Sequence, residues 1–555
     1  TAEGNVSVTG VEAAGEVGTV SIDFETDVFV TGVEAAGEAG TVSITAEGNV
    51  SVTGVEAAGE VGSVLVDAKT DVSVTGVEST GEAGSVSITA KGNVFVTGVE
   101  STGTVGTVVT SAKGVVLVSG LFATGDASTV SIAAEGNVFV TGVESTGEIG
   151  SVSIEADSDV SVTGVEAAGE IGSVSIEADS DVSVTGVEST GEIGSVSIDL
   201  KGNVNVTGVE GAGAVESVSV ASEGNVFVTG VESTGEIGTV SVNLETDVSV
   251  TGVGSSSAVG SVSVDSESNV SVTGVESTGE VGSVSTEAEG NVFVTGAEST
   301  GALGTVSLSF PRDVIAEGVS ATGTVGTVVT SAKGVVLVSG LFATGDAGTV
   351  SIAAEGNVSV TGVSGAGETS DVIVTGSALV VVSGTEGASG VGSVTASLPR
   401  DVPVTGVYAI SDVGTVEVSA PATVEITGVS VSGAVGDVTV SGIGNVTVSG
   451  TEGASEVGIV STSFPRVVSV TGAFATSAVG TVVVSAPANI NAAGSFATGV
   501  VGDVDITGDG AVTVTGVVGT SAVGDVSTSF PRVVSVTGVS ALGILGDVDI
   551  TGVCN

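Results

Sequence analysis

Acidic side chains recur at fixed positions along this sequence, and their type and spacing suit ion binding. Carboxylates crowd one turn-like segment of a repeat, as at Glu25 and Asp27, and most densely at Glu155, Asp157 and Asp159. Carboxylate oxygens are the ligands that calcium prefers in proteins. These five residues are therefore predicted as cation-binding turns with Ca²⁺ as the ion, and no other cofactor is expected.

A second set of carboxylates returns every 22 residues without interruption: Glu12, Glu34, Glu56, Glu78 and Glu100. If these residues stack at the spacing of β-strands, neighbouring charges lie about 4.8 Å apart and repel by roughly 1 kcal/mol even at the dielectric constant of water. Such a column needs screening by salt or by bound cations. A solvated acidic face and a cation-binding face both fit this pattern.

Catalytic chemistry has little support in the composition. The sequence contains no His and a single Cys, Cys554, which excludes Ser-His-Asp and Cys-His nucleophiles and His-based metal sites. Paired carboxylates can cleave glycosides. However, the acids here recur in nearly every repeat, whereas a catalytic site is singular. We therefore predict that the chain is not an enzyme.

The charge balance restricts the partners. There are 65 acidic residues against 9 basic ones, for a formal net charge of −56. Nucleic acid and anionic lipid both attract basic surfaces, so neither is an expected partner. No apolar run approaches the roughly 18 residues of a membrane-spanning helix.

A 22-residue repeat organises the whole chain. One position of the repeat is glycine in all 25 copies, from Gly10 and Gly32 through to Gly538, with no insertion or deletion. Loops normally tolerate insertions, so an unbroken period indicates that every residue stacks on its counterpart, as in a solenoid. We predict an all-β β-solenoid of about 25 stacked 22-residue coils, or roughly 120 Å of rungs. The alternatives are an antiparallel β-meander and an intertwined trimeric β-helix.

Within one repeat, apolar and polar residues alternate with the period of half-buried strands. The alternation slips by one residue near Gly10 and again near Gly18, where bends or bulges are expected. Asparagine recurs at the strand entrance, as at Asn5, Asn49 and Asn93, which predicts an asparagine ladder. The predicted inward positions are Val6, Val8, Val11, Ala13, Val17, Val20, Ile22 and Phe24.

Phenylalanines occupy a column that this alternation sends outward: Phe29, Phe95, Phe139, Phe227 and Phe293. Exposed aromatic residues in register are unusual on a monomer. They predict lateral contacts, through self-association or with other structural subunits.

The composition changes near residue 309. Residues 1–308 form an acidic repeat region, and residues 309–555 are predicted to continue the same stack with proline and arginine in one turn. The turns in question are Phe310-Pro311-Arg312, Leu398-Pro399-Arg400, Phe464-Pro465-Arg466 and Phe530-Pro531-Arg532. Proline suits a turn because no ladder donor is lost there.

The repeated phrase Val-Thr-Gly-Val-x-(Ala/Ser)-(Ala/Thr)-Gly-x-(Val/Ile)-Gly-(Thr/Ser)-Val, seen clearly from Val140 to Val152, resembles repeats in virion structural proteins of marine tailed bacteriophages. The resemblance covers essentially the whole chain. It implies a tail, neck or capsid-attached fibre, located on the virion surface or otherwise outside the cell. A secreted filament of a microbial surface or extracellular matrix is the alternative.

Overall fold

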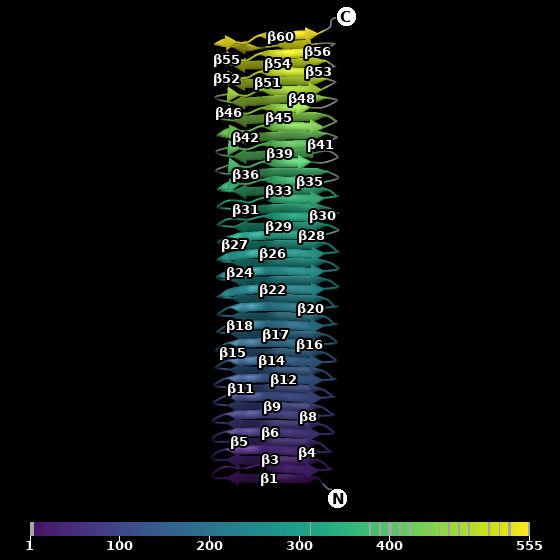
Figure 1. Ribbon diagram of the computed structural model, residues 1–555, viewed down its shortest axis with the longest axis vertical. Helices are drawn as coiled ribbons and strands as arrows, with labels where there is room; N and C mark the ends of the chain where they lie inside the picture. The colour runs from purple at the N-terminus through teal and green to yellow at the C-terminus, as the bar shows by residue number, and fades with distance from the viewer. Residues whose placement is uncertain are drawn as a thin grey trace. The chain divides into compact units, whose positions relative to one another are not determined.

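The computed structural model describes residues 5–310, 312–376, 379–387, 390–397, 402–409, 412–420, 423–442, 444–453, 456–463, 467–475, 478–486, 489–508, 511–520, 522–530 and 534–552. These residues form strands, turns and bends, with no helix among them. The chain divides into two compact units, residues 1–279 and residues 280–555. Figure 1 shows the strands of each unit stacked as successive rungs.

In the first unit, each coil contributes one strand to each of two walls. The first wall contains β1 (Val6–Ala13), β3 (Val28–Ala35), β5 (Val50–Ala57), β7 (Val72–Ser79), β9 (Val94–Ser101), β11 (Val116–Ala123), β13 (Val138–Ser145), β15 (Val160–Ala167), β17 (Val182–Ser189), β19 (Val204–Gly211), β21 (Val226–Ser233), β23 (Val248–Ser255) and β25 (Val270–Ser277). The second wall contains β2 (Val20–Phe24), β4 (Ala39–Ala46), β6 (Val61–Ala68), β8 (Ala83–Ala90), β10 (Val105–Ala112), β12 (Ala127–Ala134), β14 (Ile149–Ala156), β16 (Ile171–Ala178), β18 (Ile193–Leu200), β20 (Val215–Ser222), β22 (Glu236–Leu244) and β24 (Ala258–Ser266).

The second unit repeats this plan. Its first wall contains β27 (Val292–Ser299), β29 (Val314–Ala321), β31 (Val336–Ala343), β33 (Val358–Gly365), β36 (Val380–Gly387), β39 (Val402–Ala409), β42 (Val424–Val431), β45 (Val446–Gly453), β48 (Val468–Ala475), β51 (Ile490–Ala497), β54 (Val512–Gly519), β57 (Val534–Thr537) and β58 (Ser540–Ala541). Its second wall contains β26 (Glu280–Ala288), β28 (Leu303–Phe310), β30 (Val328–Ala332), β32 (Val350–Ala354), β35 (Val372–Gly376), β38 (Val394–Ser397), β41 (Val416–Ala420), β44 (Val438–Gly442), β47 (Val460–Ser463), β50 (Val482–Ala486), β53 (Val504–Gly508), β56 (Val526–Phe530) and β60 (Val548–Gly552).

The second wall changes after β28. Its strands shorten from eight or nine residues to four or five. Two-residue strands then form a separate ladder beside them: β34 (Glu368–Thr369), β37 (Gly390–Val391), β40 (Asp412–Val413), β43 (Ala434–Val435), β46 (Glu456–Val457), β49 (Ala478–Val479), β52 (Val500–Val501), β55 (Ala522–Val523) and β59 (Ile544–Leu545). The change follows the compositional shift predicted at residue 309, which falls inside the second unit. The Pro-Arg turns around Pro399, Pro465 and Pro531 lie outside the described residues, as does Pro311.

The pairing within each unit confirms the solenoid. Residues 22 apart pair in parallel, for example Val28 with Val50 on the first wall and Val42 with Val64 on the second. Parallel pairing contradicts an antiparallel meander. Because each coil pairs with the next coil of the same chain, an intertwined trimer is also wrong.

The core lies between the two walls and is built from small β-branched residues. In the second coil, all eight predicted inward positions are buried, with exposed fractions of 0–6%: Val28, Val30, Val33, Ala35, Ala39, Val42, Ile44 and Ala46. The first coil has a neighbour on one side only. Phe24, the equivalent of Ala46, is consequently 41% exposed there. The inward assignment is confirmed at most described positions of coils covered from both sides; Ala134, Gly376 and Gly442, in the column of Phe24, are half-buried.

The slip at Gly10 is a bulge that returns the next apolar residue to the core. Thr9 pairs with Thr31 and Val11 with Val33, while the glycine between them has no register partner. All 25 glycines of this column have a positive φ of 62–72°, a left-handed conformation that costs a side chain with a Cβ atom roughly 1–2 kcal/mol. The column is therefore glycine for conformational reasons.

The slip at Gly18 has a different cause. A Cβ atom on Gly84 would lie 1.9 Å from the carbonyl oxygen of Gly62 in the preceding coil, although φ is ordinary there. The backbones of successive coils approach closely at this bulge. Ser128 and Glu216 occupy the same column, so the coil adjusts locally where glycine is absent.

The conformational role of the first glycine column is testable at Gly164. We expect Gly164→Ala to destabilise the fold by roughly 1–2 kcal/mol, because its φ is 67°. The matched control is Gly254→Ala, since Gly254 has an ordinary φ and a Cβ atom at that position would meet nothing within 4 Å. Denaturant unfolding of both variants measures the effect. Equal midpoints would contradict the conformational explanation.

Register can be tested by deletion within the first unit. Removing residues 163–184 takes out one whole coil, so we expect a folded chain whose first unit is shorter by about 4.8 Å. Removing residues 163–173 instead places first-wall residues opposite second-wall positions and moves both glycine columns out of line. Circular dichroism and thermal melting should show native behaviour for the first deletion and loss of structure for the second. A native 11-residue deletion would rule out the stacking constraint.

Candidate functional site

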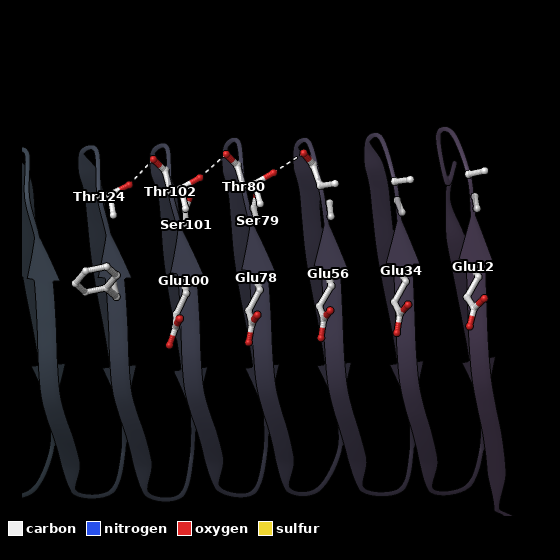
Figure 2. A pocket seen from close by; sticks show the side chains of 17 residues that line it. Glu12, Glu34, Glu56, Glu78, Ser79, Thr80, Glu100, Ser101, Thr102 and Thr124 are labelled. Carbon is white, nitrogen blue, oxygen red and sulfur yellow. Dashed lines mark hydrogen bonds between the residues drawn. The ribbon is translucent and has the colours of Figure 1, made fainter.

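The predicted glutamate column exists as a ladder on the outer face of the first wall. Glu12, Glu34, Glu56, Glu78 and Glu100 are exposed and pair in register from coil to coil. Figure 2 shows their side chains projecting in one direction from successive strands. Together with residues of the adjoining turn, such as Thr80 and Thr102, they line an open groove. No salt bridge to any of these glutamates is formed within the described residues. Their repulsion is balanced by solvent and salt.

Threonines at the turn bordering this groove link successive coils. The hydroxyls of Thr80, Thr102 and Thr124 donate to the main-chain carbonyls of Ala58, Thr80 and Thr102, respectively (Figure 2). Each bond joins residues 22 apart, so the turn is tied to its neighbours by side chains as well as by the wall ladders.

Serines at the strand end beside the same turn are buried, and their hydroxyls form hydrogen bonds within the protein. Ser101 Oγ donates to the Gly81 carbonyl at 2.5 Å and accepts the N–H of Gly103 at 3.0 Å. A buried hydroxyl without partners costs about 1–3 kcal/mol, and these two bonds avoid that cost. The inward column can therefore hold Ser where other coils hold Ala.

The opposite turn contains the predicted cation ligands, and two of them accept hydrogen bonds from the next coil. Asp27 Oδ1 accepts the N–H of Asn49 at 2.8 Å. Asp159 Oδ1 accepts the hydroxyl of Ser180 at 2.6 Å and the N–H of Asp181 at 3.3 Å. Asn49 and Asn93 accept the N–H of Asp71 and Val115 in the same way, and Asp or Asn occupies most positions of this column, with residues such as Val and Leu at the others. The predicted asparagine ladder is confirmed as a ladder of both residue types.

The other three predicted ligands, Glu25, Glu155 and Asp157, are exposed. Within the part of the chain that the structure describes, no three acidic or cysteine side chains come close enough together to hold a metal ion. Calcium binding by the five residues therefore stays a prediction.

Lysines occupy the same repeat position as Glu25 and Asp157. Ion pairs with lysine were not predicted for this column, because only its acids were considered. Lys69 pairs with Glu47, and Lys201 pairs with Asp179 at 2.6 Å. Hydrogen bonding to the carboxylate raises the pKa of each lysine above its ordinary value. All five lysines of the chain fall at this repeat position: Lys69, Lys91, Lys113, Lys201 and Lys333. Counting cations by repeat phase would have found this column.

The phenylalanine column faces outward as predicted. Phe29, Phe95, Phe139, Phe227 and Phe293 are 38–52% exposed. The outer surface thus presents apolar side chains and stacked carboxylates that recur along the coils. Polar side chains in the turns form hydrogen bonds to the next coil.

The chain matches no protein-family model, no curated protein sequence and no solved structure. Among the described residues there is no helix of the length and apolarity that crossing a bilayer requires.

Low pH should weaken the hydrogen bonds of the aspartate ladder, and the effect can be measured at Asp247. Hydrogen bonds from the Ser268 hydroxyl, from the Asn269 N–H and from the Asn269 side chain lower the pKa of Asp247 below its ordinary value. A carboxyl with a depressed pKa stabilises the fold above its unfolded-state pKa of about 3.9. That contribution is lost as the pH falls through the lower folded-state value.

The comparison is between the wild type and Asp247→Asn, whose Oδ1 still accepts hydrogen bonds but does not titrate. Protonation of the stacked glutamates relieves repulsion in both proteins, so only their difference is diagnostic. We expect the wild type to lose stability relative to Asp247→Asn in melts between pH 5 and pH 2. A difference independent of pH would contradict this role for Asp247.

Proposed function

We propose that this chain is a non-catalytic structural fibre protein, a component of an appendage of a tailed-phage virion. The supporting observation is that, among the residues the structure describes, the coils of each unit stack in register at a constant offset of 22 residues. Enzymes and receptors place their specific residues on loops that depart from the scaffold. Here the described turns repeat from coil to coil, and their side chains bind the neighbouring coil.

The surface chemistry agrees with a particle component. An outer face with stacked glutamates repels other such faces and keeps the protein in solution at high local concentration. We propose a tailed-phage virion as the particle because the repeated phrase resembles repeats in virion structural proteins of marine tailed bacteriophages. The proposed location is the virion surface, outside the host cell.

The proposal is tested on purified particles. Mass spectrometry of density-banded virions should detect the chain together with capsid and tail proteins, and antibodies against residues 1–279 should label an appendage in electron micrographs. Recovery only as free extracellular filaments, without capsid proteins, would replace the proposal with the matrix-filament alternative. Hydrolytic activity abolished by a point mutation of one acid would overturn the non-catalytic assignment.

A further inference from the structure

The outward-facing apolar residues are unevenly distributed. In the column that contains Phe29, two groups of three successive residues form continuous strips, each made of exposed phenylalanine and half-buried Leu or Ile. On the first unit, Phe95, Leu117 and Phe139 lie on three consecutive strands and pair directly in register. Phe122 lies on the same strand and face as Leu117, where neighbouring coils carry Glu100 and Glu144. We call these four residues the unit 1 patch.

The second unit contains an equivalent group. Phe293, Ile315 and Leu337 lie on three consecutive strands in the same column. Phe342 replaces the glutamate of its column and lies between Ser320 and Ser364. We call these four residues the unit 2 patch. Its phenylalanines are 42% and 51% exposed, against 36–39% for those of the unit 1 patch.

Both patches coincide with interruptions in the charge of the chain. Between Glu82 and Glu135, the only charged residues are Lys91, Glu100, Lys113 and Asp126, so this segment has no net charge. Between Glu298 and Asp346, they are Arg312, Asp313, Glu317 and Lys333, again without net charge. Acids outnumber bases over most of the remaining chain, although residues 457–502 contain Arg466 and no acid. The two patches therefore lie where a similarly acidic molecule meets little repulsion.

We infer that the two patches are contact surfaces for a second copy of this chain. The inference rests on the proposed structural role and specifies its partner. A basic partner would be drawn to the glutamate ladders, whereas a neutral apolar strip fits a partner that is itself acidic and apolar at the same place. A second copy has this chemistry, and its outer face has the same spacing between strands.

The size of the patches sets the strength of the contact. A strip of three side chains is far smaller than the roughly 800 Å² per partner of a stable interface. Each patch alone is therefore a weak contact. Repulsion between the remaining acidic faces opposes association and is screened by salt. Association should consequently strengthen as salt rises, the opposite of contacts between unlike charges.

The test is sedimentation velocity of the full chain over a range of concentrations in 0.05 M and 0.5 M NaCl. The variant replaces the strips by serine, the residue that other coils carry in this column: F95S, L117S, F139S, F293S, I315S and L337S. The matched control is L65S with Y408S, because these two residues lie outside the phenylalanine column, are at least as exposed as Phe95, and have only Ser or Glu beside them in register. Melting curves establish that both variants fold.

We expect wild-type self-association that is stronger in high salt. In the patch variant, the midpoint should move at least about tenfold to higher concentration, with less than a twofold change in the control. A wild type that stays monomeric in both salts, an equal loss in the control, or stronger association at low salt would each overturn the inference. A monomeric chain still found in virions would refute the self-contact and leave the structural role intact. Self-association of a chain that is not found in virions would support the self-contact and refute the proposed virion role.

Discussion

The structure of each unit depends on one constraint, the parallel pairing of strand residues with the residues 22 positions away. A parallel ladder satisfies the main-chain donors and acceptors of a strand only if both neighbouring strands remain in register. One extra residue in a coil would send every following side chain to the opposite face. The turns are bound by the same rule, because hydroxyls such as that of Thr102 and carboxylates such as that of Asp27 bond to the adjacent coil.

The narrow space between the walls explains which residues fill the core. Val, Ile and Ala stack on copies of themselves, and the structure tolerates a polar atom inside when the next coil supplies a partner, as Gly81 does for Ser101. Thr110, Thr286 and Thr330 occupy the inward column that starts at Ile22, and their buried hydroxyls have no partner. Thr has nearly the shape of Val, so packing is preserved at those positions while the unpaired hydroxyl costs free energy.

Much of this fold could be predicted because the period is strict. The inward residues, the two glycine bulges and the outward phenylalanines all follow from the alternation within one coil. What the pattern could not show is which atoms a polar side chain contacts. For Asp159 the sequence indicated only a carboxylate in a turn, and the hydrogen bonds that it accepts from Ser180 and Asp181 became visible in the structure. The shortening of the second wall after β28 was also missed, because the valines and glycines on either side of that change are arranged alike.

The constant separation of paired residues has a consequence for how the chain reaches its native state. Contacts between residues 22 apart are local for a chain of 555 residues, and low contact order favours rapid folding. Once two coils have formed, each new segment emerging from the ribosome finds a complete template directly before it, so folding can proceed in step with synthesis. The first pair of coils is then the slow step. The characteristic folding error is a register shift of one whole coil, because a segment shifted by 22 residues still pairs almost every side chain with a similar one.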